Sequence, residues 1–177
     1  LSLDAARIGV KCLYLARINR VDIIWTVNYL SREVTRWNKA CDKRLHRLIC
    51  YLHFNSNLIQ AGWVGNKVED CKLMLFADAS FATDLKDSRS TTGMVLALVG
   101  SQTFVVLGWM CKKQGAVSHS STEAEVIGLE AGVRLEGIPA LILCEEITSV
   151  FCPAAGSKVK KFAPNPTCLL YTSPSPR

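Results

Sequence analysis

The sequence lacks the features that would place the chain in a membrane, in an oxidising compartment or among zinc proteins. No stretch of about 18 apolar residues occurs, and no signal-peptide pattern follows Leu1. The eight cysteines include no C-x-x-C pair and no zinc-ligand spacing, so we expect reduced, mostly buried thiols. These absences predict a soluble intracellular protein, or a fragment of a longer one, with no membrane partner.

Charge is distributed unevenly along the 177 residues. Residues 1–69 carry 11 Lys/Arg and 5 Asp/Glu, whereas residues 70–150 carry 6 and 10. A basic front part suits contact with a polyanion, and an acidic middle part suits cation binding. The composition, 49% apolar and 20% charged, is globular, and the length suffices for one or two small cores.

Residues 3–53 have the apolar periodicity of helices. The stripe in "DIIWTVNYLSREV" consists of Ile23, Ile24, Val27, Leu30 and Val34, and Asp22 is the expected N-cap. The stripe in "KACDKRLHRLICYLH" consists of Cys41, Leu45, Leu48, Ile49 and Leu52. The other face of this second helix carries Lys39, Lys43 and Arg47 at four-residue spacing. That row is either a solvated helix face or a line of phosphate contacts, and the sequence leaves both open.

The periodicity changes after residues 55–70, which are rich in Asn and Gly and form an expected linker or hairpin edge. We place a domain boundary near 65–70. The segments "CKLMLFA", "GMVLALVG" and "TFVVLGWM" predict three buried strands, the last two joined by a hairpin at 100–102. A helix follows, with Ala124, Ile127, Ala131 and Leu135 on one stripe and an interruption near Pro139. Residues 151–177 hold five of the six prolines, and "PTCLLY" predicts one more short strand.

The first turn of that helix carries two glutamates with different expected roles. Ser120-x-x-Glu123 is a capping-box pattern, in which Ser120 accepts from the N–H of Glu123 and Glu123 reaches back to the N–H of Ser120. Glu125 has no such role. It is expected on the flank shared with Gly128 and Gly132, where small residues would let the helix approach the sheet, and where burying a carboxylate is costly.

Asp78 ends the first strand, in "FADAS". If the helix packs on that strand, Asp78 and Glu125 could converge, and two neighbouring carboxylates repel unless a cation lies between them. Hard oxygen ligands favour Mg²⁺. The alternative is two exposed acids, one at a strand end and one at a helix start.

Four segments together resemble the ribonuclease H part of copia-type LTR retrotransposon polyproteins. They are "FADAS", "DLKDSRSTTG", "GWMCKKQ" and "SHSSTEAEVIGLEAG", in this order. The segment "LYLARINRVDIIWTVNYLSREVTRWNKACDKRLHRLICYLH" resembles the connection between the reverse transcriptase and the ribonuclease H. The resemblance is collinear over residues 7–150.

The resemblance implies a mixed five-stranded sheet flanked by helices, with the first three strands antiparallel. It implies hydrolysis of the RNA strand of an RNA–DNA hybrid by two Mg²⁺ ions held by four acids. Asp78 matches the first acid and Glu125 the second, which makes both of them metal ligands and catalytic residues. Lys112 and Lys113 are either contacts to the hybrid backbone or part of a solvated turn. The implied partners are the hybrid and the rest of the reverse transcriptase polyprotein, and the implied location is a cytoplasmic particle or the nucleus.

The chain departs from the family in two places. Ser80 and Thr83 stand where members often have Asp and Gly, and the third acid, expected after "PTCLLYT", is replaced by Ser173. No Asp or Glu follows Glu146, and the end of the tail, "CLLYTSPSPR", does not resemble the family, so Ser173–Arg177 is expected to be non-native. With two of four ligands, we expect a truncated and inactive chain.

The predicted fold class is α/β, a helical N-terminal segment followed by an incomplete ribonuclease H-like fold of three antiparallel strands, a helix and a possible fourth strand. The predicted domains are 1–65, 70–150 and a Pro-rich tail, 151–177. The alternative function is a non-catalytic nucleic-acid-binding remnant that uses the basic helix 38–53. A weaker alternative takes D-A-S as a relative of the aspartic protease loop, and the collinear resemblance disfavours it.

Overall fold

The computed structural model describes residues 2–82, 87–151 and 167–170. The chain divides into two compact units, Leu1–Ala61 and Gly62–Arg177. The division falls just before the region 65–70, where the change of periodicity placed a boundary. Among the described residues, no helix is both long enough and apolar enough to cross a bilayer.

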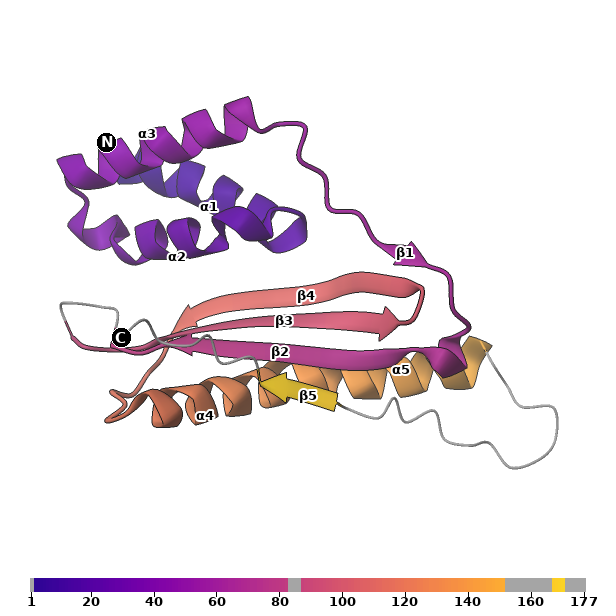
Figure 1. The fold of residues 1–177 in the computed structure, drawn as a ribbon. Helices are drawn as coiled ribbons and strands as arrows, with labels where there is room; N and C mark the ends of the chain where they lie inside the picture. Colours follow the sequence, from indigo (N-terminus) through magenta and orange to yellow (C-terminus); the bar gives the residue numbers. More distant parts are fainter. Residues whose placement is uncertain (1, 83–86, 152–166, 171–177) are drawn as a thin grey trace. The chain divides into compact units, whose positions relative to one another are not determined.

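The first unit consists of three helices (Figure 1), α1 (Ser2–Ile18), α2 (Ile24–Arg32) and α3 (Lys39–Phe54), with short 3₁₀ turns at Val21–Ile23 and Val34–Arg36. Their buried apolar residues form one cluster: Ala5, Cys12, Ala16, Ile23, Val27, Leu30, Cys41, Leu45 and Leu48. Most of the two expected stripes is therefore confirmed. Ile49 is the exception, because it turns away from the line of buried residues on α3 and is 41% exposed.

The prediction that Asp22 caps α2 is wrong, because the chain makes a 3₁₀ turn first and α2 begins after Ile23 with no side-chain cap. Asp22 instead accepts two hydrogen bonds from the guanidinium of Arg20, at 3.0 and 2.8 Å. This guanidinium lowers the pKa of the Asp22 carboxyl, and it also donates to the Asn55 carbonyl at the end of α3. Asn38 caps α3, and its Oδ1 accepts from two backbone N–H groups of the first turn.

The second unit is built on a sheet whose strands are β1 (Trp63–Val64), β2 (Lys72–Ser80), β3 (Thr91–Gly100), β4 (Thr103–Lys113) and β5 (Thr167–Leu170). Their order across the sheet is β1-β4-β3-β2-β5. β5 is parallel to β2, whereas the other neighbours are antiparallel. The three-strand meander, the hairpin at 100–102 and the later strand in "PTCLLY" are thus confirmed.

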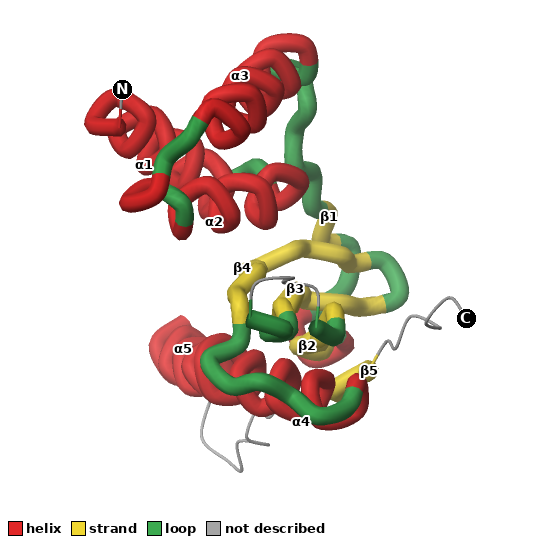
Figure 2. Tube along the Cα trace, turned by 90° about the vertical axis from the view of Figure 1, so that its left-hand side faces the viewer, coloured by secondary structure: helices red, strands yellow, loops and turns green. Residues whose placement is uncertain are grey.

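Two helices, α4 (Ser121–Gly132) and α5 (Ile138–Phe151), lie along one face of this sheet, as Figures 1 and 2 show. A π-helical turn, Val133–Gly137, joins them, and the N–H of Ile138 bonds to the Val133 carbonyl. This wider turn is the expected interruption near Pro139, which has no N–H to offer the helix ladder.

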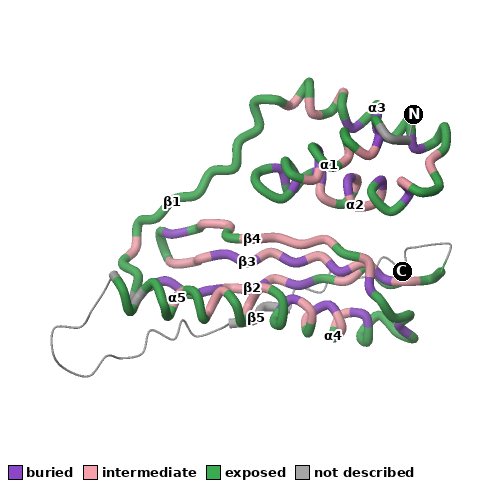
Figure 3. The backbone as a smooth tube through the Cα atoms, turned by 180° about the vertical axis from the view of Figure 1, so that it is seen from behind, coloured by how far each residue is buried: buried purple, intermediate pink, exposed green. Residues whose placement is uncertain are grey.

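The core of the second unit lies between β2, β3 and α4, where Figure 3 shows buried residues. Its buried members are Leu75, Ala77, Met94 and Leu96. On α4 the buried residues are Ala124, from the expected stripe, and Gly128 and Gly132, which were expected where the helix approaches the sheet, whereas Leu135, in the turn after α4, is 40% exposed. The difference arises because glycines bring the helix backbone close to the sheet. The predicted class, a mixed α/β chain with a helical front segment, is confirmed.

Candidate metal centre and nucleic-acid interface

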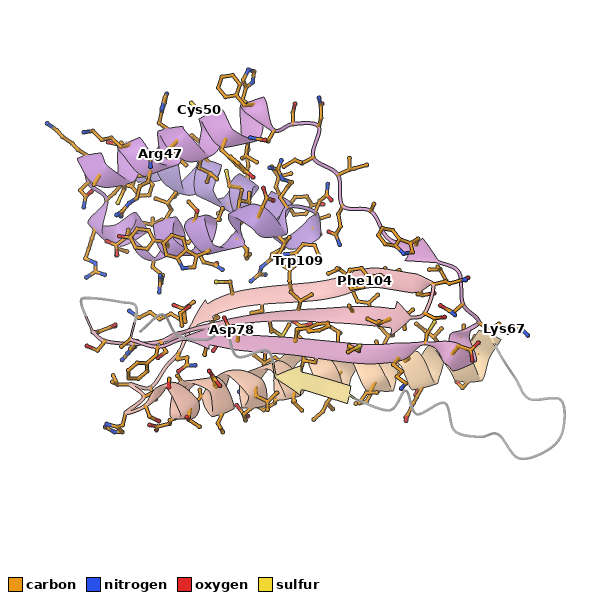
Figure 4. The ribbon with its side chains drawn as sticks, in the orientation of Figure 1. Arg47, Cys50, Lys67, Asp78, Phe104 and Trp109 are labelled. Atoms are coloured by element: carbon orange, nitrogen blue, oxygen red, sulfur yellow. The ribbon has the colours of Figure 1, made fainter. Side chains whose placement is uncertain are left out.

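Asp78 lies near the end of β2, where Figure 4 labels it. The pairing of β2 with β3 runs without a shift from Lys72 to Ser80, so side chains alternate strictly between the two faces. Ala77 is in the core against α4, and a Cβ on Gly128 would lie 3.6 Å from that of Ala79. Asp78, between these two alanines, therefore points to the face away from α4, and it is exposed.

Glu125 is positioned by the start of α4. Ser120 Oγ accepts from the N–H of Glu123 at 3.1 Å, which caps the helix. The Glu123 carboxylate accepts from the N–H of His119 at 2.6 Å, one residue before the group that a capping box would use. Glu125 is half-buried and lies beside the buried row that begins with Ala124.

Asp78 and Glu125 lie at the same end of the second unit but come from opposite faces of the sheet. Because Gly132 lies at Leu75 and Gly128 at Ala79, α4 runs antiparallel to β2 and starts beside the end of that strand. For the two carboxylates to meet, their side chains would have to reach past β2, at its edge or at its end. The pairing of β2 with β5 ends at Ala77 and Leu170, one residue before Asp78. No group of three or more His, Cys, Asp or Glu among the described residues is placed to hold a metal ion.

The two lysines before α4 have different environments, although they are adjacent in sequence. Lys113 Nζ forms an ion pair with Asp87 Oδ2 at 2.6 Å, and its side chain is only 17% exposed. It therefore holds the loop between β2 and β3. Lys112 pairs across the sheet with Thr92, which is on the α4 face, and its side chain is exposed. Of the two, Lys112 has the side chain that a phosphate could reach.

Lys39, Lys43 and Arg47 all lie on α3 and are exposed, and Figure 4 labels Arg47 on this helix. None of the three forms an ion pair with a residue in the described part of the chain. The spacing of four residues places them along one side of the helix, at about 6 Å of rise from one to the next. This geometry leaves the row open to a polyanion.

A buried polar network that the sequence did not suggest ties β4 to α4. Gln114 Nε2 donates to Thr92 Oγ1 at 2.9 Å and to the Ala124 carbonyl at 2.7 Å, and its Oε1 accepts from Ser118 Oγ at 3.1 Å. Gln114 is the last residue of the K-K-Q motif, which was the signal available. The network fixes the first turn of α4 against the sheet and so positions Glu125.

Comparison with known proteins finds no family model that matches the chain. The secreted RxLR effector protein 161 of Plasmopara viticola is 30% identical over 122 residues, which are 69% of this chain and 81% of that protein. The chain belongs to the family of this Plasmopara protein. Secretion and an effector role are named for that relative only.

The chain is also related to a retrotransposon polyprotein. The retrovirus-related Pol polyprotein from transposon RE1 of Arabidopsis thaliana is 30% identical over an alignment of 168 residues that covers 85% of this chain. The chain spans 11% of the length of that polyprotein. Both units of this family member thus have their counterpart within one short region of a Pol polyprotein.

Proposed function

We propose that the chain is a region of a copia-type retrotransposon polyprotein that descends from a metal-dependent ribonuclease H. The parent activity is cleavage of the RNA strand of an RNA–DNA hybrid. The observation that carries the proposal is the order β4-β3-β2-β5, with Asp78 at the end of β2 and Glu125 in the first turns of α4. The similarity to a Pol polyprotein supports the same origin.

The residues present fit a two-metal centre only in part. Asp78 and Glu125 would be the ligands, and a bound Mg²⁺ would activate a water and stabilise the leaving 3′ oxygen. The register of β5 brings its last described residue, Leu170, beside Ala77. The ribonuclease H resemblance puts the third acid just after this strand, where the sequence reads Tyr171, Thr172 and Ser173, outside the described residues. With half of the acids, the chain should bind metal weakly and not catalyse.

The test is an assay of the whole 177-residue chain on a labelled RNA–DNA hybrid with Mg²⁺ or Mn²⁺, beside an intact ribonuclease H. We expect no hybrid-specific cleavage by the wild type, Asp78→Asn or Glu125→Gln, with unchanged circular dichroism in all three. Robust cleavage that Glu125→Gln abolishes would contradict the account of an incomplete site.

A second candidate function is supported by the cations of α3, namely binding of a nucleic-acid backbone without catalysis. Lys39, Lys43 and Arg47 are exposed in a row, and each phosphate contact adds roughly 0.7–0.9 to the slope of log affinity against log salt. Lys43→Gln and Arg47→Gln should each lower this slope. Arg134→Gln is the control, since Arg134 lies in the π-helical turn after α4 and is paired with Glu130. Equal slopes in all variants would exclude this surface.

A further inference from the structure

A different surface of the helical unit combines aromatic rings with arginines. On α2 the rings of Trp25 and Tyr29 are stacked, with centroids 5.8 Å apart and planes 22° from parallel. Trp25 is 56% exposed, although a tryptophan side chain is usually largely buried in a folded protein. Tyr29 is half-buried, so Trp25 is the solvent end of the stack.

Two guanidinium groups hold Tyr29 in place. The Cζ of Arg44, from α3, lies 4.6 Å from the centre of the Tyr29 ring, and this arginine also donates to the Tyr29 hydroxyl. The Cζ of Arg32, one turn further along α2, lies 5.8 Å from the same ring. The arrangement is a ladder of flat groups, in which cation–π contacts fix the inner ring and leave the outer indole accessible.

Three of the four acids of this unit have partners outside the ladder. Asp22 is paired with Arg20 and Glu33 with Arg36, and Asp42 accepts the indole N–H of Trp37 at 2.7 Å. On α3, Arg47 lies beside both Arg44 and Lys43, because residues three and four apart are neighbours on a helix. The exposed ring therefore lies at the border of a positively charged surface.

We propose that Trp25, Tyr29, Arg32 and Arg44 form a stacking site for an unpaired base of a single-stranded nucleic acid. A base can lie on the exposed indole because every base has a π face, while the arginines and the nearby cations of α3 contact the adjacent phosphates. A continuous duplex presents no free base face, so it should gain nothing from Trp25. The proposal deepens the second candidate function and rests on it for the phosphate contacts only.

The experiment measures the fluorescence anisotropy of fluorescein-labelled oligothymidylate, oligouridylate and a blunt duplex with the 177-residue chain. Base stacking is worth about 1–3 kcal/mol, so Trp25→Ala should weaken binding to the single strands roughly 5- to 150-fold. The salt slope and the affinity for the duplex should stay unchanged. Tyr14→Ala is the matched control, since Tyr14 is 67% exposed on α1 and should be neutral. The strand that binds more tightly identifies RNA or DNA as the natural ligand.

Quenching of tryptophan emission gives a second measure that does not depend on a truncating substitution. A saturating oligonucleotide should quench the wild type, and Trp25→Phe, which keeps a ring for folding and binding, should abolish most of the quenching. Quenching that persists in Trp25→Phe, or an effect of Trp25→Ala below twofold, would overturn the stacking site. Loss of affinity in Arg47→Gln without any loss in Trp25→Ala would leave the second candidate standing and reject this one. The reverse result would reject the α3 row and keep the stacking site.

Discussion

Alanine should act in opposite directions at Gly128 and Gly132, although both lie on the buried face of α4, one turn apart. At Gly128 a Cβ would lie 3.2 Å from both Cγ2 and Oγ1 of Thr92. Thr92 is unable to yield easily, because Gln114 Nε2 donates to its Oγ1 at 2.9 Å and both side chains are buried. At Gly132 the nearest atoms are the flexible ends of a leucine at 3.4 Å and a methionine at 3.5 Å, which are ordinary contacts.

The expected changes in the free energy of unfolding combine the helix propensity of alanine, the cost of overpacking and the loss of a hydrogen bond. Alanine is favoured over glycine in a helix by about 1 kcal/mol, and neither site needs an unusual backbone conformation. At Gly132 most of that gain should remain, so the alanine variant should be more stable by about 0.5–1 kcal/mol. At Gly128 overpacking costs about 1–3 kcal/mol and displacing Thr92 from its hydrogen bond costs about 1 kcal/mol. After subtraction of the helix gain, Gly128→Ala should lose about 1–3 kcal/mol.

Thermal denaturation followed by circular dichroism separates the two cases, since 1 kcal/mol moves Tm by roughly 4–8 °C in a unit of this size. Gly132→Ala should raise Tm and Gly128→Ala should lower it. Thr92→Ser removes one of the two close atoms but keeps the hydroxyl, so it should partly rescue Gly128→Ala. Shifts of the same sign in both glycine variants would refute the close packing of α4 on β3.

Three further predictions concern the helical unit. Asn38→Ala removes a cap that accepts two N–H groups and should cost about 1 kcal/mol in urea denaturation, while Asn38→Asp should retain most of it. Arg20 lowers the pKa of Asp22, so this pair stabilises the fold above the unfolded value of about 3.9 and loses its effect as pH falls through the folded pKa. Asp22→Asn should therefore lower stability at neutral pH and flatten the decline below about pH 4; an unchanged profile would count against the pair. Burial raises the pKa of the Cys12 thiol, so iodoacetamide and mass spectrometry should find that Cys12 is alkylated more slowly than the half-buried Cys50; equal rates would contradict the packing of α1.

The sequence predicted correctly those strands and helix breaks that depend on residues close together in the chain. The strands β2, β3 and β4 follow from apolar runs separated by turn residues, and the break before α5 follows from Pro139. The start of α2 was misplaced because a 3₁₀ turn intervenes and Arg20 takes the carboxylate that would have capped the helix. Arg20 is only two residues from Asp22, so the ion pair itself is local, and what the apolar pattern did not indicate is the 3₁₀ turn that moves the helix start beyond Asp22.

The sequence predicted Asp78 at a strand end and Glu125 in the first turns of a helix, but it did not predict how the two lie relative to the sheet. The face on which Asp78 lies is decided by where α4 packs, which is a tertiary property. The glycines of α4 were expected to let the helix approach the sheet and are buried, whereas the apolar stripe also included Leu135, which is 40% exposed. Similarly, the sequence did not distinguish Lys113 from Lys112, because the ion pair of Lys113 with Asp87 joins residues that are 26 positions apart.

We propose that Asp78 and Glu125 are two ligands of one metal site. Titration of the 177-residue chain with Mn²⁺, followed by electron paramagnetic resonance of the free ion, tests it directly. The account predicts one weak site that Asp78→Asn and Glu125→Gln each remove, with no further loss in the double variant. Glu130→Gln, on the same helix and paired with Arg134, should leave the binding unchanged. Binding that survives either single substitution, or that falls equally in Glu130→Gln, would show that the two carboxylates do not share an ion.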